Sequence, residues 1–153
     1  MSALELKIPP VAVTLLLAGL MWGMGHTPPG FDLPLAPRLT ALAVFASAAA
    51  TVGLSAVWSF RRARTTVNPL SPQGCTVLVT SGVFRFSRNP MYLALLLALV
   101  GWGLFLANGV AVLLALAFIP YMNRFQIAPE ERTLQQAFGH AFDDYCRQVR
   151  RWL

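Results

Sequence analysis

Charged side chains are scarce in this chain of 153 residues, of which 12% are charged and 56% are hydrophobic. A soluble domain carries about 25% charged residues, so the composition argues against a soluble globular protein. Charge is missing altogether between Asn89 and Asn123, and it is also missing from the stretches 8–25 and 39–60. A membrane-spanning helix needs about 20 apolar residues, and these stretches are long enough to supply them.

Potential metal ligands are equally rare. The chain has two cysteines, Cys75 and Cys146, and two histidines, His26 and His140. The cysteines lack the close spacing of a zinc-binding pair, and the histidines are predicted to lie on opposite sides of the membrane. The sequence therefore excludes a structural zinc site, and we expect no metal.

The uncharged stretches predict an all-α, polytopic integral membrane protein that forms one domain over residues 1–153. Asn108-Gly109 is typical of a tight turn, so it divides the longest stretch into two antiparallel spans. The first span exceeds the apolar core of about 7–15 residues that a signal peptide has, which favours its retention. The four predicted transmembrane helices cover about 8–25, 39–60, 90–106 and 110–123, with a cytoplasmic loop over 61–89.

The distribution of arginine indicates the orientation. The loop 61–89 and the region after the fourth span are rich in arginine, whereas the connection between the first two spans has only Asp32 and Arg38 as charged residues. The positive-inside rule therefore places the loop and both termini in the cytoplasm, with the protein in the inner membrane. Membrane topology accounts for the net charge of +6, so we expect no nucleic-acid partner.

The tail of the chain predicts an amphipathic C-terminal helix over 129–152. Ala128-Pro129-Glu130-Glu131 is typical of a helix start with acids in the first turn. The helix is expected either to lie in the membrane interface or to pack over the loop 61–89. Apolar residues recur along it at helical spacing and form one stripe: Leu134, Phe138, Phe142, Tyr145, Val149 and Trp152.

Polar and aromatic residues gather at the cytoplasmic ends of the third and fourth spans. Asn89-Pro90 is typical of a helix cap and first helical residue, and the free N–H groups there can receive a carboxylate. Tyr92 follows in the first turn, and Glu130-Glu131 comes after the fourth span. Each has an ordinary structural explanation, such as capping or the helix macrodipole. Because the hairpin brings both ends to one membrane face, together they predict an active site.

Two ordered blocks resemble those of a known family. The segment from Leu78 to Tyr92 resembles the Leu-Val-x-x-Gly…Arg-His-Pro-x-Tyr block of isoprenylcysteine carboxyl methyltransferases and related phospholipid methyltransferases. The tail from Glu130 to Arg151 is similar to that family's Glu-Glu…Phe-Gly…Tyr block, so the resemblance covers about 65–153. It implies a membrane enzyme that uses S-adenosylmethionine (SAM). The cofactor would lie under the loop, and a lipophilic acceptor (a thiol, a carboxylate or a lipid amine) would enter from the bilayer.

The resemblance also implies roles for individual residues. Glu130, Tyr92 and Asn89 would be catalytic, and Arg124 and Gln126 would contact the acceptor. The cofactor-binding positions would be Thr76, Val77, Leu78, Val79, Phe84, Asn89, Pro90, Met91, Tyr92 and Glu130.

Three positions depart from the family's pattern. Asn89 replaces a histidine, so no imidazole base is present there, and Ala94 replaces a residue that is often glycine. Gln126 stands where eukaryotic members have an arginine thought to meet the substrate carboxylate. This last departure weakens the case for prenylcysteine as the acceptor.

Two other functions are compatible with the sequence. Sterol reductases resemble this family in their C-terminal half but use NADPH, and Arg85 and Arg88 are candidates for its extra phosphate. A non-catalytic membrane protein that has kept the scaffold is the third hypothesis. Binding of SAM and of NADPH distinguishes the three.

Overall fold

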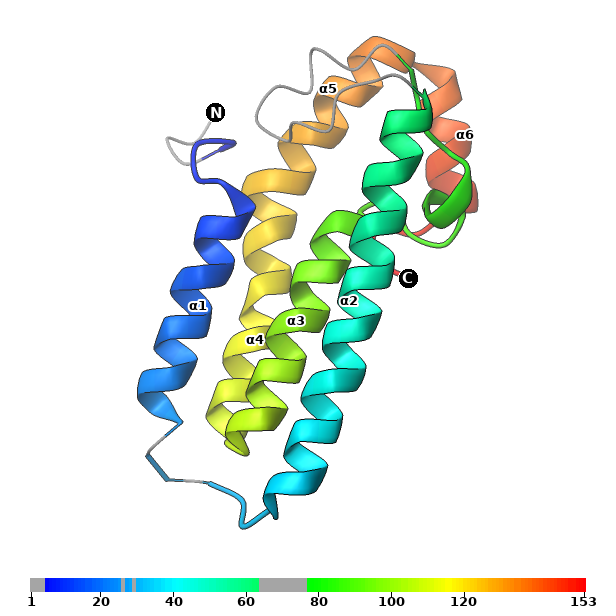
Figure 1. Ribbon diagram of the computed structural model, residues 1–153. Helices are drawn as coiled ribbons and strands as arrows, with labels where there is room; N and C mark the ends of the chain where they lie inside the picture. Colours follow the sequence, from blue (N-terminus) through cyan, green and yellow to red (C-terminus); the bar gives the residue numbers. More distant parts are fainter. Residues whose placement is uncertain (1–4, 26, 29, 64–76) are drawn as a thin grey trace.

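The computed structural model describes residues 5–25, 27–28, 30–63 and 77–153, and this part of the chain is helical, without a strand (Figure 1). His26, Cys75 and Thr76 lie outside the described residues. Four apolar helices lie side by side: α1 (Pro10–Met24), α2 (Leu35–Ala63), α3 (Pro90–Leu106) and α4 (Gly109–Met122). The remaining elements are the 3-10 helix η2 (Gly82–Arg85), the π-helical segment η3 (Asn123–Ile127), α5 (Ala128–Phe138) and α6 (His140–Gln148).

Within the described part of the chain, two continuous helices are long and apolar enough to cross a membrane. They are α2, with 29 residues, and the stretch Gly109–Phe138, with 30 residues. The apolar helices α1 and α3 are shorter, with 15 and 17 residues. Large apolar side chains face outward from the bundle, and Leu15 and Leu54 are 67% and 70% exposed. Apolar surface of this kind suits lipid rather than water, so the structure supports an integral membrane protein.

Local sequence determines where α3 ends and α4 begins. Ala107 follows α3 with a φ of 50°, in the left-handed region that often terminates a helix. The side chain of Asn108 then caps α4, because its Oδ1 accepts hydrogen bonds from the N–H groups of Val110 and Ala111, at 2.9 and 3.1 Å. Its Nδ2 donates to the carbonyl oxygens of Met24 and Thr27, which ties the end of α1 to this turn.

Helices α2 and α3 approach closely at Gly101. A methyl group at this position would lie 2.6 Å from Cβ of Phe45, so only glycine fits. The core between α1, α3 and α4 is centred on three side chains that are almost fully buried, Met21, Leu99 and Phe118.

A second apolar cluster joins α6 to η2 and the end of α2. Figure 1 shows α6 beside η2 at the end of the bundle opposite the α1–α2 connection. The apolar stripe of the tail therefore packs over the segment before α3, which was one of the two predicted placements. The buried members of the cluster are Ala56, Val79, Phe84, Phe142, Tyr145 and Val149.

The tail differs from the prediction in two ways. The helix does not restart at Ala128, because η3 joins α4 to α5 without a break. The predicted single helix over 129–152 is instead two helices separated at Gly139, whose φ is 51°, and it ends at Gln148. A positive φ carries little penalty only at glycine. The apolar stripe gave no sign of this break, because its helical spacing continues across it.

The first two helices also differ from their predicted ranges. Helix α1 is shorter than 8–25, and α2 extends beyond 39–60 at both ends. The extension of α2 includes Arg38, whose Nε donates to the carbonyl oxygen of Phe105 at 2.6 Å. Because this contact satisfies a charged residue inside a helix, the limit of the uncharged stretch was a poor guide to the helix end.

Candidate active site

The chain's last residues, 149–153, run beside the segment that leads into α3. The N–H of Arg88 donates to the carbonyl oxygen of Arg150 at 3.0 Å. Nδ2 of Asn89 donates to the carbonyl oxygen of Arg151 at 2.9 Å, so this side chain does not cap α3 as predicted. Instead, Asn89 holds the C-terminal residues against the start of α3.

Glu131 on α5 binds two arginines from these segments. Its carboxylate lies 3.0 Å from Nη2 of Arg88, and it accepts a hydrogen bond from Nε of Arg151 at 3.1 Å. The hydrogen bond to Glu131 is the main reason why the pKa of Arg151 is raised. The side chains of Arg88 and Glu131 are only 13% and 19% exposed. Separating these groups would leave a poorly hydrated charge without its counter-ion, which is costly. The network therefore holds α5, the C-terminal residues and the segment before α3 together.

Tyr92 and Glu130 meet where α3 and α5 approach each other. Tyr92 is 6% exposed, and its hydroxyl group donates a hydrogen bond to Oε1 of Glu130. Glu130 is partly buried and forms no ion pair with the described residues, since Arg88 and Arg151 both bind Glu131. A partly buried carboxylate with a single neutral donor retains unused acceptor capacity, which favours a ligand that brings further donors.

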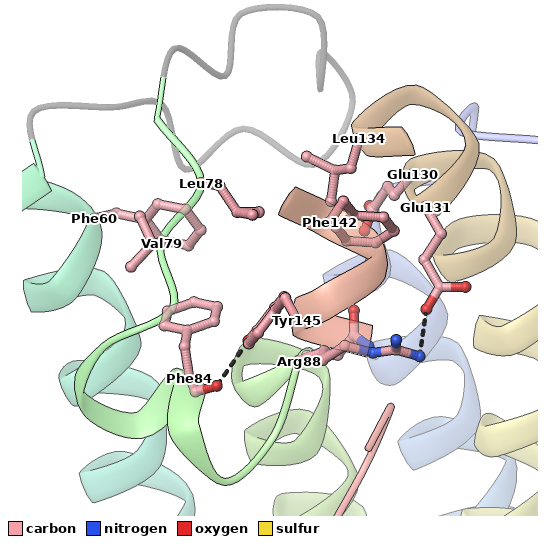
Figure 2. A pocket seen from close by; sticks show the side chains of 11 residues that line it. Phe60, Leu78, Val79, Phe84, Arg88, Glu130, Glu131, Leu134, Phe142 and Tyr145 are labelled. Carbon is pink, nitrogen blue, oxygen red and sulfur yellow. Dashed lines mark hydrogen bonds and ion pairs between the residues drawn. The ribbon is translucent and has the colours of Figure 1, made fainter. Parts of the chain in front are cut away.

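Two adjoining cavities meet at Glu130, and they enclose about 70 and 100 Å³. A ligand the size of a nucleotide therefore requires their walls to move apart. Figure 2 shows the first cavity, which lies between the 78–84 segment, α5 and α6. Its lining consists of Phe60, Leu78, Val79, Phe84, Arg88, Asn89, Glu130, Glu131, Leu134, Phe142 and Tyr145. The second cavity is lined by Phe60, Phe84, Arg88, Asn89, Pro90, Met91, Tyr92 and Glu130.

The walls of the first cavity are mainly apolar, and aromatic side chains form a large part of them. The rings of Phe60 and Phe84 meet edge to face, with centroids 5.1 Å apart. The hydroxyl group of Tyr145 donates to the carbonyl oxygen of Phe84 at 2.7 Å (Figure 2). Burial raises the pKa of Tyr145, so this hydroxyl group stays protonated and keeps donating. The contact holds α6 against η2 and gives the cavity a fixed wall.

Arg88 presents an unused donor at this site. Its Nε is buried and has no hydrogen-bond partner among the described residues, although Nη2 binds Glu131. Buried donors are almost always paired in native proteins. Because Arg88 lines both cavities, an acceptor group of a ligand is a suitable partner for it.

A third cavity, of about 320 Å³, lies on the other side of Tyr92 between α1, α2 and α3. We call it the apolar groove. It shares Met91 and Tyr92 with the second cavity. Tyr92 is the only residue in its described lining that carries a polar side-chain group. The lining consists of Pro10, Val11, Gly53, Val57, Met91, Tyr92, Ala94 and Leu95.

The structure brings together most of the residues singled out in the sequence. Val77 is 46% exposed and lines neither cavity at Glu130, and Thr76 is outside the described residues. Arg124 binds Glu5 at 2.9 Å, and Gln126 is fully buried, donating to the carbonyl oxygen of Ile8 at 2.6 Å. Neither lines these cavities. Those predicted to bind the cofactor that do line them are Leu78, Val79, Phe84, Asn89, Pro90, Met91, Tyr92 and Glu130.

Several lining residues were absent from the predicted site. Sequence signals existed for some of them: Leu134, Phe142 and Tyr145 belong to the apolar stripe, and Glu131 is half of the acidic pair. No signal pointed to Phe60, which is brought in from α2 by tertiary packing. Arg88 was named only as a candidate for the phosphate of NADPH. The lining residues that the predicted SAM site did not include are Phe60, Arg88, Glu131, Leu134, Phe142 and Tyr145.

Together these features place an acidic and partly aromatic site beside an apolar groove, at one end of a bundle of apolar helices. Residues 38–141 match the sequence profile of the phospholipid methyltransferase family. This match covers more than half of the chain, so the chain belongs to the phospholipid methyltransferase family. The family expected from the sequence is confirmed.

Two relatives are similar to this chain over shorter stretches. An uncharacterised protein of Haemophilus influenzae is 49% identical over 63 residues, which are 41% of this chain and 100% of that protein. Protein-S-isoprenylcysteine O-methyltransferase B of Arabidopsis thaliana is 36% identical over 75 residues. The latter match covers 47% of this chain but only 36% of the plant protein. No solved structure matches the chain.

Proposed function

We propose that this protein transfers a methyl group from SAM to a lipophilic acceptor that carries a thiol, a carboxylate or an amine. One observation carries the proposal. Tyr92 separates two kinds of space, with the cavities at Glu130 on one side and the apolar groove on the other. A polar cofactor and a lipophilic acceptor can therefore approach the same point from opposite directions.

The residues around Glu130 suit the chemistry of SAM. The Glu130 carboxylate can accept hydrogen bonds from the ammonium group or the ribose hydroxyls, and Nε of Arg88 can donate to an oxygen. The rings of Phe60, Phe84 and Phe142 offer apolar faces to the adenine and to the sulfonium cation, a contact worth about 0.5–2 kcal/mol. When bound, SAM supplies an electrophilic methyl group.

The chain's own residues contribute positioning rather than covalent catalysis. Burial raises the pKa of the Cys146 thiol, which keeps it protonated and therefore a weak nucleophile. Asn89 is an amide and cannot act as a base. Tyr92 and Glu130, which are hydrogen-bonded to each other, hold one edge of the site in place. Direct in-line transfer to an acceptor that is already ionised, or that ionises easily, fits these residues best.

We further propose that all four apolar helices cross the membrane, with both termini and the site on the cytoplasmic side of the inner membrane. The arginine distribution supports this orientation. A reporter fused after Leu153 should be active only in the cytoplasm. Activity of this fusion on the outer side would contradict the proposed face of the site.

The reductase hypothesis finds less support. An extra ribose phosphate requires a free cation, but Arg88 is already paired with Glu131. Arg85 is exposed and lines neither cavity at Glu130. Neither of the two candidate arginines therefore supplies the basic site that would favour NADPH over SAM.

Calorimetry on the purified full-length protein in detergent should show binding of SAM and not of NADPH. Transfer of label from SAM is then measured for lipophilic thiols, carboxylates and amines, and for water-soluble counterparts such as free cysteine. We expect label only in the lipophilic acceptors. Binding of NADPH without SAM would reject the proposal, and methylation of soluble acceptors alone would reject the role of the groove.

The groove itself can be tested with Ala94→Leu. Gly53 and Ala94 face each other across the groove, and a methyl group on Gly53 would already lie 3.4 Å from Cβ of Ala94. A larger side chain at position 94 should therefore fill the groove at this point. Transfer should fall while SAM affinity stays unchanged. Leu54→Met, at an exposed neighbouring position, is the control and should have no effect. Full activity of Ala94→Leu would show that the acceptor takes another route.

A further inference from the structure

A separate cavity lies at the other end of the bundle, far from Glu130 along the helices. It encloses about 550 Å³, within the range of about 300–1,000 Å³ that is usual for ligand sites. The end of α1, the α1–α2 connection, the start of α2 and the end of α3 form its walls. Its lining consists of Trp22, Gly25, Gly30, Phe31, Asp32, Arg38, Phe105, Leu106 and Ala107.

Hydrogen bonds from the backbone and from the side chain of Asn108 hold the walls of this cavity in place. The N–H of Phe31 donates to the carbonyl oxygen of Ala107 at 2.7 Å, and Gly30 pairs with Asn108. Nδ2 of Asn108 binds the carbonyl oxygen of Thr27 at 2.7 Å. The connection is therefore fastened to the α3–α4 turn, and the cavity is part of the folded structure.

Arg38 is fixed in this cavity with part of its guanidinium unused. Nε donates to the carbonyl oxygen of Phe105 at 2.6 Å, and the guanidinium carbon lies 5.3 Å from the centre of the Phe105 ring. Among the described residues, neither Nη1 nor Nη2 has a hydrogen bond or an ion pair. These two nitrogens form the planar fork that binds phosphate oxygens well.

Asp32 lines the same cavity but does not pair with Arg38 within 4.0 Å, and its exposed carboxylate has no partner among the described residues. The cavity thus presents one cation and one anion separately. Phe31 adds an exposed aromatic ring, whose face attracts ammonium groups. A ligand that matches this arrangement carries a phosphate and an amine on one short chain.

We infer that this cavity binds the headgroup of a zwitterionic phospholipid, with its phosphate on Arg38 and its amine or quaternary ammonium near Asp32 and the ring of Phe31. The location favours a lipid over a soluble molecule. The cavity lies where the apolar helices end, at the level of the headgroups in a membrane, and large apolar side chains flank it. Phe31 and Leu35 are 58% and 59% exposed. The inference is independent of the proposed methyl transfer.

The test is native mass spectrometry of the full-length protein in detergent, with dioleoyl lipids that carry phosphocholine, phosphoethanolamine or phosphoglycerol headgroups. Soluble phosphocholine is the fourth ligand. We expect one bound copy of each zwitterionic lipid, weaker retention of the phosphoglycerol lipid and no retention of soluble phosphocholine. Equal retention of soluble phosphocholine would overturn the lipid assignment, and equal retention of all three lipids would overturn the role of Asp32.

Two variants locate the site. Arg38→Ala should reduce retention of all lipids by about tenfold, because it removes charge-assisted hydrogen bonds to the phosphate. Arg38→Lys keeps the charge but lacks the planar guanidinium. If this variant retains an intermediate amount of lipid, the loss in Arg38→Ala is due to weaker lipid binding and not to misfolding. Asp32→Asn should abolish the preference for zwitterionic lipids without reducing the retention of the phosphoglycerol lipid.

The controls are Arg147→Ala and Asp144→Asn, which change the same charges in an exposed ion pair on α6. Both should retain lipid as the unaltered chain does, and all variants should keep its SAM affinity. Unchanged lipid retention in both Arg38→Ala and Asp32→Asn would overturn the inference.

Discussion

The two ends of the bundle hold their charged side chains in different ways. At the end formed by α5 and α6, Glu131 binds Arg88 and Arg151, so these charges fasten protein segments to one another. At the other end, Arg38 and Asp32 line one cavity without pairing. The two ends therefore differ in whether their charges are paired within the protein. Paired charges shape a site, and unpaired charges remain available to a ligand.

Glu130, in the first end's cavities, forms no ion pair with the described residues, and its replacement should have the largest effect. Glu130→Ala should reduce SAM affinity by about tenfold to a hundredfold, because ligand donors lose their acceptor at a cost of about 1–3 kcal/mol. Calorimetry measures the change. His140→Ala, at an exposed position on α6, should leave the affinity unaltered. An unchanged affinity in Glu130→Ala would remove Glu130 from the site.

Removing the shared acid of the network should destabilise the fold. Glu131→Ala leaves Arg88 and Arg151 without their carboxylate. Breaking a fully buried pair costs about 3–5 kcal/mol, and we expect about 2 kcal/mol here because Arg88 is 13% and Arg151 36% exposed. Thermal unfolding in detergent measures the loss. Asp144→Ala, which breaks an exposed pair, should change stability by less than about 0.5 kcal/mol. Equal effects of the two variants would refute the distinction between them.

At the opposite end, a neutral side chain connects the helices. Asn108 accepts two hydrogen bonds at the start of α4 and donates two to the end of α1. Asn108→Ala should lower the free energy of unfolding by about 1–2 kcal/mol, through loss of the cap and of buried hydrogen bonds. Lipid retention should fall with it, while SAM affinity persists in the folded fraction. A parallel loss of SAM affinity would mean that the two ends are not independent.

The smallest effect is expected at the break between α5 and α6. Gly139→Ala adds a methyl group that meets nothing within 4 Å, so its cost is the backbone strain of a φ of 51° alone, about 1 kcal/mol. Gly19→Ala also meets nothing within 4 Å but lies inside α1, where alanine is favoured, so it should not destabilise the protein. The midpoint temperatures of thermal unfolding compare the two variants. Equal midpoints would show that the backbone at Gly139 is not strained.

The sequence predicted those features of the fold that depend on local pattern. The start of the third helix at Pro90 follows from the proline itself, and the meeting of Tyr92 with Glu130 follows from a hairpin that returns to the same face. The fusion of α4 with α5 could not be predicted, because the Pro129 region has the composition of a helix start. The contact of Asn89 with the carbonyl oxygen of Arg151 could not be predicted either, because every residue has a backbone carbonyl group and the sequence does not indicate which one accepts.

The charge network and the cavity lined by Arg38 and Asp32 could not be predicted from the sequence, for a related reason. Arg88 and Arg85 look equivalent in the chain, and only tertiary packing places Arg88 beside Glu131 while leaving Arg85 exposed. Arg38 and Asp32 were noticed only as sparse charges in a short connection. The distances between helices determine which of these charges form pairs, and the periodicity of the sequence does not reveal these distances.

The unbroken helix Gly109–Phe138 has a consequence for the host bilayer. Its 30 residues rise about 45 Å at about 1.5 Å each, whereas a hydrocarbon core is about 30 Å thick. Glu130 lies about 33 Å along the axis from Asn108, close to one core thickness. If Asn108 lies at one headgroup layer, Glu130 therefore reaches the opposite one. Longer acyl chains would draw its carboxylate into hydrocarbon, so we expect the rate of methyl transfer to fall as the bilayer thickens.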